Sequence, residues 1–424
     1  MAAIAATSTR ANSRWLLALA AAAACGCPAA LAEEPIRRPA PADAVARLEA
    51  KHAADPGDLA TIERLAEALL KRVRVSADPR DAARAEALVA RALELAPKDA
   101  RAWNLKAWTE LSAHRFGVAL ASAQQGRRLG PPSAVNLGLL ADALVELGRY
   151  ADAVQRTQEL VDRFPGLPAY SRGAHLRFLH GDLPGAIALM RQAVQAGRPR
   201  TEETAWGLTQ LAELYVQDGK LELAEQAAQA ALGTLPGSLQ AKAQLGRVRE
   251  GQGRFEDALA LYRETAETQP SPEFVFAHWR LAKRLGHGTE AKRQAELLKG
   301  LARLDEKGGL YRRPLAEFFA MQPDGLAEAE RLARLELASR PDIYSHDALA
   351  WVLYRAGKLG LARTHAEAAL KLGTPDVALQ YRTGLVLSAA GEPKRGGALL
   401  REAGMRAPHL DPRPLLDIAE RRAG

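Results

Sequence analysis

The residue types that could carry chemistry are few and scattered along this chain. Its nine histidines include no His-Glu-x-x-His pair of the kind that binds zinc. His175 and His180 could lie near each other at one helix end, but no carboxylate at a suitable spacing completes a site. Since a metal or catalytic site needs several convergent partners, we predict no bound metal and interpret these imidazoles as satisfied or solvent-facing.

Cofactor-binding patterns are missing as well. The sequence has no Gly-x-x-x-x-Gly-Lys-Ser/Thr phosphate loop and no Asp-rich calcium loop. Gly251-Gln252-Gly253 begins like a dinucleotide-binding fingerprint, but the third glycine is missing and no strand precedes it, which favours a turn between helices. We therefore predict no cofactor and no enzyme activity. The remaining enzyme hypothesis is a site around residues 300–323, with Glu317 as its main candidate.

Helical hairpins are the elements that would have to position any site. In residues 133–165, four apolar residues follow the i, i+3, i+4, i+7 spacing of one helix face: Leu137, Leu140, Ala141 and Leu144. Gly148 can end that helix with a positive φ, and Pro165 cannot continue the second helix that follows. A hairpin of this length cannot bury its apolar face alone, so it requires similar neighbours.

Those neighbours recur at a fixed step of 34 residues. The step relates Pro97, Pro131 and Pro165, then Pro236 and Pro270, and likewise Ala85, Ala119 and Ala153, then Ala224 and Ala258. A plain helical bundle with accidental spacing would not keep prolines and alanines in phase in this way. Since only 5% of the residues are aromatic while 48% are hydrophobic, alanine carries much of the apolar pattern.

This pattern resembles the tetratricopeptide repeat family. The matching residues form four sets: Trp103, Ala107, Ala119 and Pro131; Ala141, Gly148, Tyr150, Ala153 and Pro165; Leu211, Ala212, Tyr215, Gly219, Ala224, Ala231 and Pro236; and Gly246, Gly253, Phe255, Ala258, Tyr262 and Pro270. The resemblance covers roughly 80% of the chain. It implies an all-α fold, a right-handed α-solenoid of about ten helix-turn-helix repeats that forms an α-α superhelix.

The order of segments follows from this assignment. We expect a signal peptide at 1–32, a linker with a lone helix at 33–57, a solenoid in two segments at 58–306 and 307–409, and a tail at 410–424. The hairpin at residues 168–199 is degenerate, because Pro184 falls where its second helix should start. Proline is tolerated in a first helical turn, so this hairpin can persist.

The N-terminus has the three parts of an export signal in order. Arg10 and Arg14 supply positive charge, ten apolar residues follow, and Ala30-Leu31-Ala32 is a cleavage site of the A-x-A type. We expect an exported protein, periplasmic or secreted. The alternative is an outer-membrane lipoprotein, since Cys25 follows three alanines in a loose lipobox.

Charge and cysteine content narrow the possible partners. The formal charge of +8 is mild for 424 residues, and basic residues alternate with acidic ones along the helices, which is typical of solvated faces. We therefore expect no nucleic-acid partner and no membrane span. Both cysteines, Cys25 and Cys27, lie in the signal, so the cleaved protein would contain neither a disulfide nor a cysteine metal site.

The resemblance also implies where a partner would bind. In this family the first helices of the repeats line an inner groove that holds peptides. Carrying that register onto this chain suggests Arg101, Asn104, Trp108, Asp142, Ser171, His175, Thr209, Glu213, Arg247, Tyr344 and Trp351. We predict a non-enzymatic scaffold or adaptor in the cell envelope that binds a partner polypeptide. The alternative is a lipid-anchored assembly or secretion component tethered through Cys25.

Overall fold

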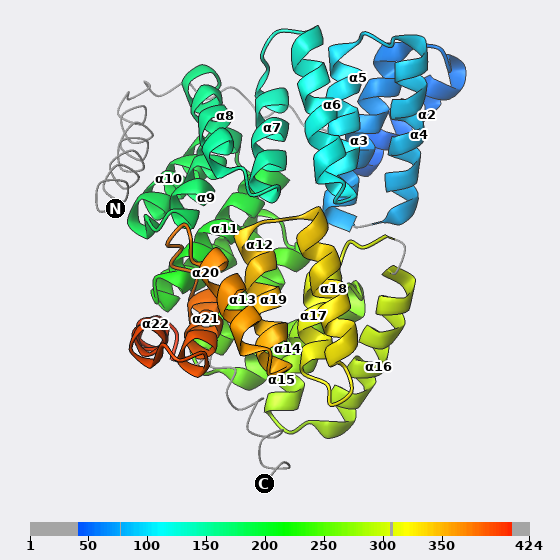
Figure 1. The fold of residues 1–424 in the computed structure, drawn as a ribbon. Helices are drawn as coiled ribbons and strands as arrows, with labels where there is room; N and C mark the ends of the chain where they lie inside the picture. The colour runs from blue at the N-terminus through cyan, green and yellow to red at the C-terminus, as the bar shows by residue number, and fades with distance from the viewer. Residues whose placement is uncertain (1–40, 77, 306–307, 409–424) are drawn as a thin grey trace, which may run out of the picture. The chain divides into compact units, whose positions relative to one another are not determined.

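The computed structural model describes residues 41–408, apart from residues 77 and 306–307. The expected signal peptide, most of the linker and the tail lie outside this range. The described residues form 21 helices and no strand (Figure 1). The all-α solenoid predicted from the sequence is therefore confirmed. No described helix is both long enough and apolar enough to cross a membrane.

Consecutive helices pack as hairpins, which we describe as an A helix followed by a B helix. After α2 (Pro41–Ala54) come ten such pairs. They are α3 (Leu59–Ser76) with α4 (Pro79–Leu95), α5 (Ala100–Ser112) with α6 (Phe116–Leu129), α7 (Ala134–Glu146) with α8 (Tyr150–Arg163), α9 (Leu167–Leu179) with α10 (Leu183–Ala196), α11 (Glu202–Gln217) with α12 (Leu221–Thr234), α13 (Leu239–Gly251) with α14 (Phe255–Thr268), α15 (Pro272–Arg284) with α16 (Gly288–Asp305), α17 (Arg312–Ala320) with α18 (Leu326–Ser339), α19 (Ile343–Arg355) with α20 (Leu359–Ala369), and α21 (Val377–Ala389) with α22 (Pro393–Arg406).

The two kinds of helix begin differently. Most A helices begin at a side-chain cap, in which an oxygen accepts a hydrogen bond from a backbone N–H of the first turn. The capping residues are Asp99, Ser133, Thr201, Ser238, Ser271, Asp342 and Asp376. Most turns from A to B instead contain a glycine with positive φ, as expected from the sequence for Gly148, and in the turn between α5 and α6 His114 takes this conformation.

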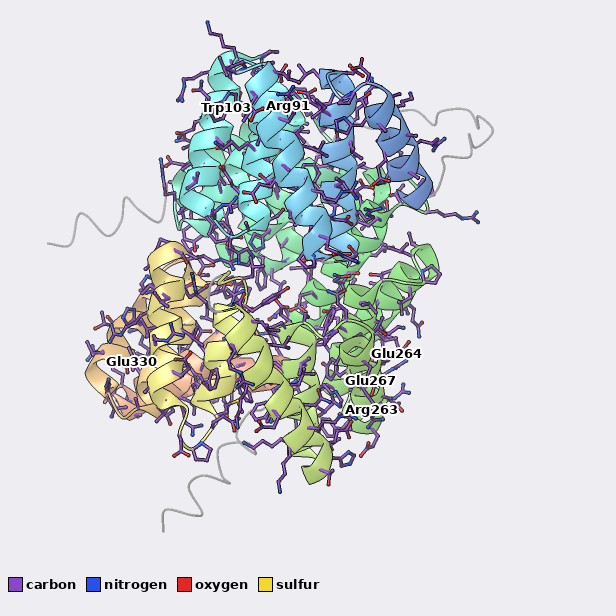
Figure 2. The ribbon with its side chains drawn as sticks, turned by 90° about the vertical axis from the view of Figure 1, so that its right-hand side faces the viewer. Arg91, Trp103, Arg263, Glu264, Glu267 and Glu330 are labelled. Carbon is purple, nitrogen blue, oxygen red and sulfur yellow. The ribbon has the colours of Figure 1, made fainter. Side chains whose placement is uncertain are left out.

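The in-phase alanines and prolines have separate roles. Ala85, Ala119 and Ala153 are completely buried, so their small side chains let neighbouring helices approach closely. Pro97 follows the end of α4. Its carbonyl accepts a hydrogen bond at 2.9 Å from Nε1 of Trp103, which lies on α5 (Figure 2). Proline thus ends a B helix while its carbonyl is bound by the next A helix.

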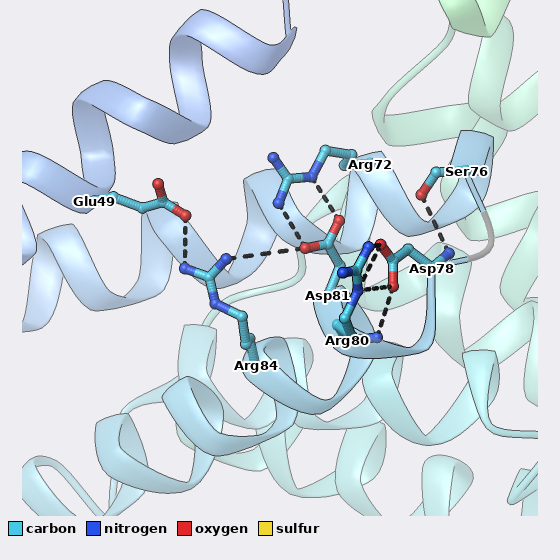
Figure 3. Close-up of polar contacts among 7 residues, drawn as sticks. All are labelled: Glu49, Arg72, Ser76, Asp78, Arg80, Asp81 and Arg84. Atoms are coloured by element: carbon cyan, nitrogen blue, oxygen red, sulfur yellow. Dashed lines mark hydrogen bonds and ion pairs between the residues drawn. The ribbon is translucent and has the colours of Figure 1, made fainter.

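The first hairpin is held by acidic residues at the start of each of its helices. Asp58 accepts a hydrogen bond from the backbone N–H of Thr61 at the start of α3, and Asp78 caps α4. Asp81 instead accepts two hydrogen bonds from Arg72 of α3, at 2.6 and 2.5 Å (Figure 3). The helix expected to stand alone, α2, packs on α3, where its Val45 is 1% exposed.

The hairpins group into two compact units, residues up to 165 and residues from 166 onward. We call them unit 1 and unit 2. The weak join predicted at residues 307–309 falls within unit 2, between α16 and α17, and partly outside the described residues. The degenerate hairpin persists as expected, because Pro184 lies in the first turn of α10. Each unit is described below by itself.

Candidate binding chamber

The A helices of unit 2 surround a cavity of about 720 Å³. Its walls come from α11, α13, α15, α17, α19 and α21, with contributions from the B helices α14 and α22. We call this cavity the chamber. Its volume falls in the range of ordinary ligand pockets, roughly 300–1,000 Å³.

The chamber is closed because the early and late hairpins of unit 2 touch. Gln217, at the end of α11, accepts a hydrogen bond through Oε1 from the backbone N–H of Val377 at 2.8 Å. Arg406, at the end of α22, donates to the carbonyls of Pro375 at 2.6 Å and Gln217 at 3.4 Å. We call these contacts the seam. The two contacts made by Gln217 join residues 160 and 189 positions apart in the sequence.

Two glycines allow the backbones to approach at the seam. Gly181 and Gly219 have φ of 88° and 71°, as their turns require. A Cβ atom on Gly181 would lie 2.9 Å from the carbonyl oxygen of Gly373, and one on Gly219 would lie 3.0 Å from that of Arg406. These two positions therefore require glycine both for the turn and for the seam, whereas a Cβ on Gly286, with φ of 78°, would meet nothing within 4 Å.

A recurring ion pair connects successive A helices. Arg247 of α13 lies 3.2 Å from Glu213 of α11, and Arg280 of α15 donates to Glu250 of α13 at 2.7 Å. In the same way Arg382 of α21 donates to Asp347 of α19 at 2.9 Å. Unit 1 has the same contact between Arg101 of α5 and Glu67 of α3, at 2.8 Å.

We call these four contacts the ladder. Each arginine reaches back about one repeat, to the preceding A helix. The ladder therefore ties neighbouring hairpins together through their inner faces.

Burial and the facing arginines oppose each other in setting the pKa of the two buried ladder carboxylates, Glu250 and Asp347. Burial disfavours the charged form of Glu250, but Arg280 and Arg284 outweigh it and lower the pKa of Glu250. Asp347 is completely buried, and this burial raises its pKa to about 6 despite the opposing effect of Arg382. The arginines of the chamber wall are thus already engaged by carboxylates of the protein.

Four of the eleven residues predicted to line the inner groove lie on the chamber wall. They are Thr209, Arg247, Tyr344 and Trp351. Glu213 lies beside them as the ladder partner of Arg247. Ser171 is buried and donates its hydroxyl hydrogen bond to the carbonyl of Pro168, while His175 is exposed on the same helix.

The other four predicted residues belong to unit 1. Arg101 is a member of the ladder, and Asn104 accepts a hydrogen bond from Asn136 of the next A helix at 2.7 Å. Trp108 packs against a hydrophobic core, and Asp142 is half-buried on α7. Whether any of the eleven contacts a partner stays a prediction.

Sequence reasoning missed several residues of the chamber wall. Among them are four aromatic residues, Tyr262, Phe274, Phe276 and Tyr381, and two acids, Glu273 and Asp376. Asp376 caps α21 and Glu273 lies in the first turn of α15, so in the sequence both look like ordinary helix-start residues. Their place on the chamber wall depends on how the A helices are arranged in space.

The residue types that bind metal ions form no metal-binding cluster in the described part of the chain. No three histidine, cysteine, aspartate or glutamate side chains gather there in an arrangement that could hold a metal ion. His180 Nδ1 lies 2.8 Å from the carbonyl of Leu176 in its own helix. Glu317, the candidate of the enzyme hypothesis, lies on the chamber wall with its carboxylate 3.3 Å from Arg382 Nη1.

Comparison with curated protein sequences finds no match. Among solved structures, the chain is similar to the APC/C hetero-tetramer Cut9–Hcn1, with 18% identity, a TM-score of 0.47, and coverage of 81% of this chain and 62% of that one. It is also similar to Naa15/Naa10 bound to HypK-THB, with 15% identity, a TM-score of 0.27, and coverage of 84% and 65%. The chain thus spans less than two thirds of either of these two structures.

A third similar structure is the human IFIT1 dimer with PPP-AAAA, at 17% identity, a TM-score of 0.48, and coverage of 74% and 73%. Likenesses of this size carry no argument about function. The family comparison is more specific. A model described as "Tetratricopeptide repeat" matches residues 139–200, 209–283 and 348–408, and the described helices pack in consecutive pairs as a tetratricopeptide-repeat-like α-solenoid.

Proposed function

We propose that this protein is a non-enzymatic interaction scaffold and that the chamber of unit 2 receives a segment of a partner polypeptide. The observation that carries the proposal is the chamber itself, which is lined by the A helices of repeats of a type that binds proteins. Its wall combines aromatic and aliphatic side chains with charged groups that converge from several A helices, as in a binding site.

The ladder supports binding by a preformed surface. Since Arg247, Arg280 and Arg382 already have carboxylate partners, the wall does not need to rearrange its charges when a ligand enters. A surface that is ordered before binding loses little conformational entropy, and this leaves more of the contact energy for affinity.

Site-specific photocrosslinking tests the proposal. A photoreactive amino acid at Tyr344, on the chamber wall, is expected to capture a polypeptide in the native host. The control position is Glu267, whose side chain is 56% exposed on α14 (Figure 2). Capture of the same proteins at both positions, or at neither, would contradict a binding role for the chamber.

We further propose that the protein is exported and acts in the cell envelope. The proposal is supported by the charged, apolar and A-x-A parts of residues 1–32 in their expected order. Mass spectrometry of the mature N-terminus tests it: a first residue of Glu33 supports export with cleavage. An N-terminal, lipid-modified Cys25 would instead support the tethered alternative, and an intact Met1 would refute both.

A further inference from the structure

The arginines of the chamber wall all have carboxylate partners, but not all of its carboxylates have a basic partner in contact. Each of its three arginines is bound by a ladder carboxylate, and Arg382 also lies beside Glu317. Glu273 and Asp376, in contrast, are in salt-bridge contact with no cation of the described residues: Arg313 acts on Glu273, and Arg247 and Arg382 on Asp376, only at longer range, and Asp376 accepts the backbone N–H of Leu379. The wall therefore presents two carboxylates that no guanidinium contacts directly, whereas each of its three arginines contacts a carboxylate.

Acidic groups still outnumber guanidinium groups when the charged residues next to the wall are included. Arg284 lies 3.8 Å from Glu250, and the guanidinium of Arg313 lies 5.7 Å from the ring centre of Tyr344. With these two, five guanidinium groups face six carboxylates, namely Glu213, Glu250, Glu273, Glu317, Asp347 and Asp376. Lys283 approaches the wall only at the Met321 carbonyl, 3.4 Å away, and lies over the buried ring of Trp279.

The environment of Glu273 also favours a cationic partner. The surrounding walls of the chamber partly desolvate this carboxyl group and raise its pKa. The Glu273 side chain is nevertheless exposed, so a ligand can reach it, and its partial desolvation leaves its charge less screened than that of a carboxylate in bulk water.

Aromatic faces complete the site. Phe274 and Phe276, both half-buried, contribute to the same wall, whereas the rings of Tyr344 and Trp351 already lie beside Arg313 and Arg355. A ring face attracts an ammonium or guanidinium group, and it also packs well against the aliphatic stem of a lysine or arginine side chain.

The seam limits the length of what can enter. Because Gln217 and Arg406 join the early and late hairpins, the A helices of unit 2 enclose the chamber on its sides rather than forming an extended groove. A cavity of about 720 Å³ matches a ligand of a few residues.

We propose that the chamber binds a short polypeptide segment that carries a lysine or arginine beside apolar residues, with Glu273 and Asp376 as the partners of its positive charge. This proposal rests on the proposed function and adds the chemistry of the partner. It also predicts that acidic segments are rejected.

The test uses the full chain, immobilised, and an equimolar mixture of random heptapeptides. Peptides that are retained and then eluted are sequenced by mass spectrometry. We expect lysine and arginine to be enriched over the input and aspartate and glutamate to be depleted. Elution without this bias, or with enrichment of acidic residues, would overturn the proposal.

Matched variants assign the effect to the two acids. In Glu273→Gln combined with Asp376→Asn the bias should disappear, and a retained cationic peptide should bind roughly tenfold more weakly or worse, as expected for loss of a charge-assisted contact. Asparagine caps a helix as well as aspartate, so α21 keeps its start. Glu273→Gln alone, at an exposed position, provides a second variant with even less risk to folding.

The control variant is Glu267→Gln, on the exposed face of α14, which should keep both the bias and the affinity. If the double variant keeps them as well, the positive charge is not bound by these acids and the proposal fails. Specific peptide retention without a charge bias, with capture at Tyr344, would leave the scaffold function intact while refuting this inference. No retention and no capture would refute both.

Discussion

Replacing Gly219 by alanine tests whether the chamber is closed in solution. Its φ of 71° lies in the left-handed region, where a residue with a Cβ costs roughly 1–2 kcal/mol. The new Cβ would also lie 3.0 Å from the carbonyl oxygen of Arg406 and 3.5 Å from its Cα. Both are backbone atoms, so the end of α22 must move away rather than a flexible side chain.

Gly286→Ala is the matched control. It has the same turn conformation, with φ of 78°, but its Cβ would meet no atom within 4 Å. The two variants therefore share the cost of the left-handed backbone, and only Gly219→Ala strains the seam. The seam consists mainly of a hydrogen bond between neutral groups and one from the Arg406 guanidinium, together about 2–4 kcal/mol.

Hydrogen exchange at the backbone amide of Val377 measures the seam directly, because this amide donates to Gln217. A local readout is needed, since repeat arrays often do not unfold as one cooperative unit. In Gly219→Ala we expect exchange at Val377 to accelerate by at least about tenfold, the effect of roughly 1.4 kcal/mol of lost protection. Unchanged exchange in this variant, or equal acceleration in Gly286→Ala, would show that the seam does not hold unit 2 closed.

Three further predictions concern stability, each measured by urea denaturation of the full chain. Glu250→Gln should destabilise unit 2 by roughly 3–5 kcal/mol, since it breaks a buried ladder pair. Glu67→Gln, in the partly exposed ladder pair of unit 1, should cost at most about 1 kcal/mol. Equal losses of stability in the two variants would contradict the role of burial. Burial and the neighbouring carboxylate of Asp99 raise the pKa of Glu63 to about 7, above its unfolded value near 4.5. The protonated form therefore stabilises unit 1 at low pH, and we expect about 1–2 kcal/mol of this stability, after solvent screening, to be lost as the pH rises toward 7. Glu63→Gln should remove this pH dependence, and its persistence in that variant would refute the assignment. Ala153→Leu should lower the free energy of unfolding by roughly 1–3 kcal/mol or more, because it overpacks a completely buried helix contact. Ala151→Leu, exposed on the same helix, should leave the free energy of unfolding nearly unchanged. Similar losses in both variants would argue against close helix packing at Ala153.

The hairpin array was predictable because its determinants are local. Amphipathic spacing sets the helices, and glycine and proline set their ends within a few residues. Pro184 illustrates this, since its place in the first turn of α10 followed from proline chemistry alone. Asp81 shows the limit: it lies in the first turn of α4, but its arginine partner belongs to the preceding helix.

The chamber was predictable only in part. The family register pointed to Thr209, Tyr344 and Trp351, because a residue's position within an A helix decides whether it faces inward. The register did not identify Glu273 or Asp376, whose place at helix starts has a sufficient local explanation as capping or first-turn acids.

The sequence by itself determined that the protein is built from helical hairpins. Each hairpin packs on the next one through the same positions, so the small and helix-ending residues recur about every 34 residues. The charge pairing of the inner face and the closure of unit 2 were decided only by the tertiary structure. The bond between Gln217 and Val377 crosses 160 residues, and no short-range pattern can encode the small rotations of successive hairpins that add up to bring those two residues together.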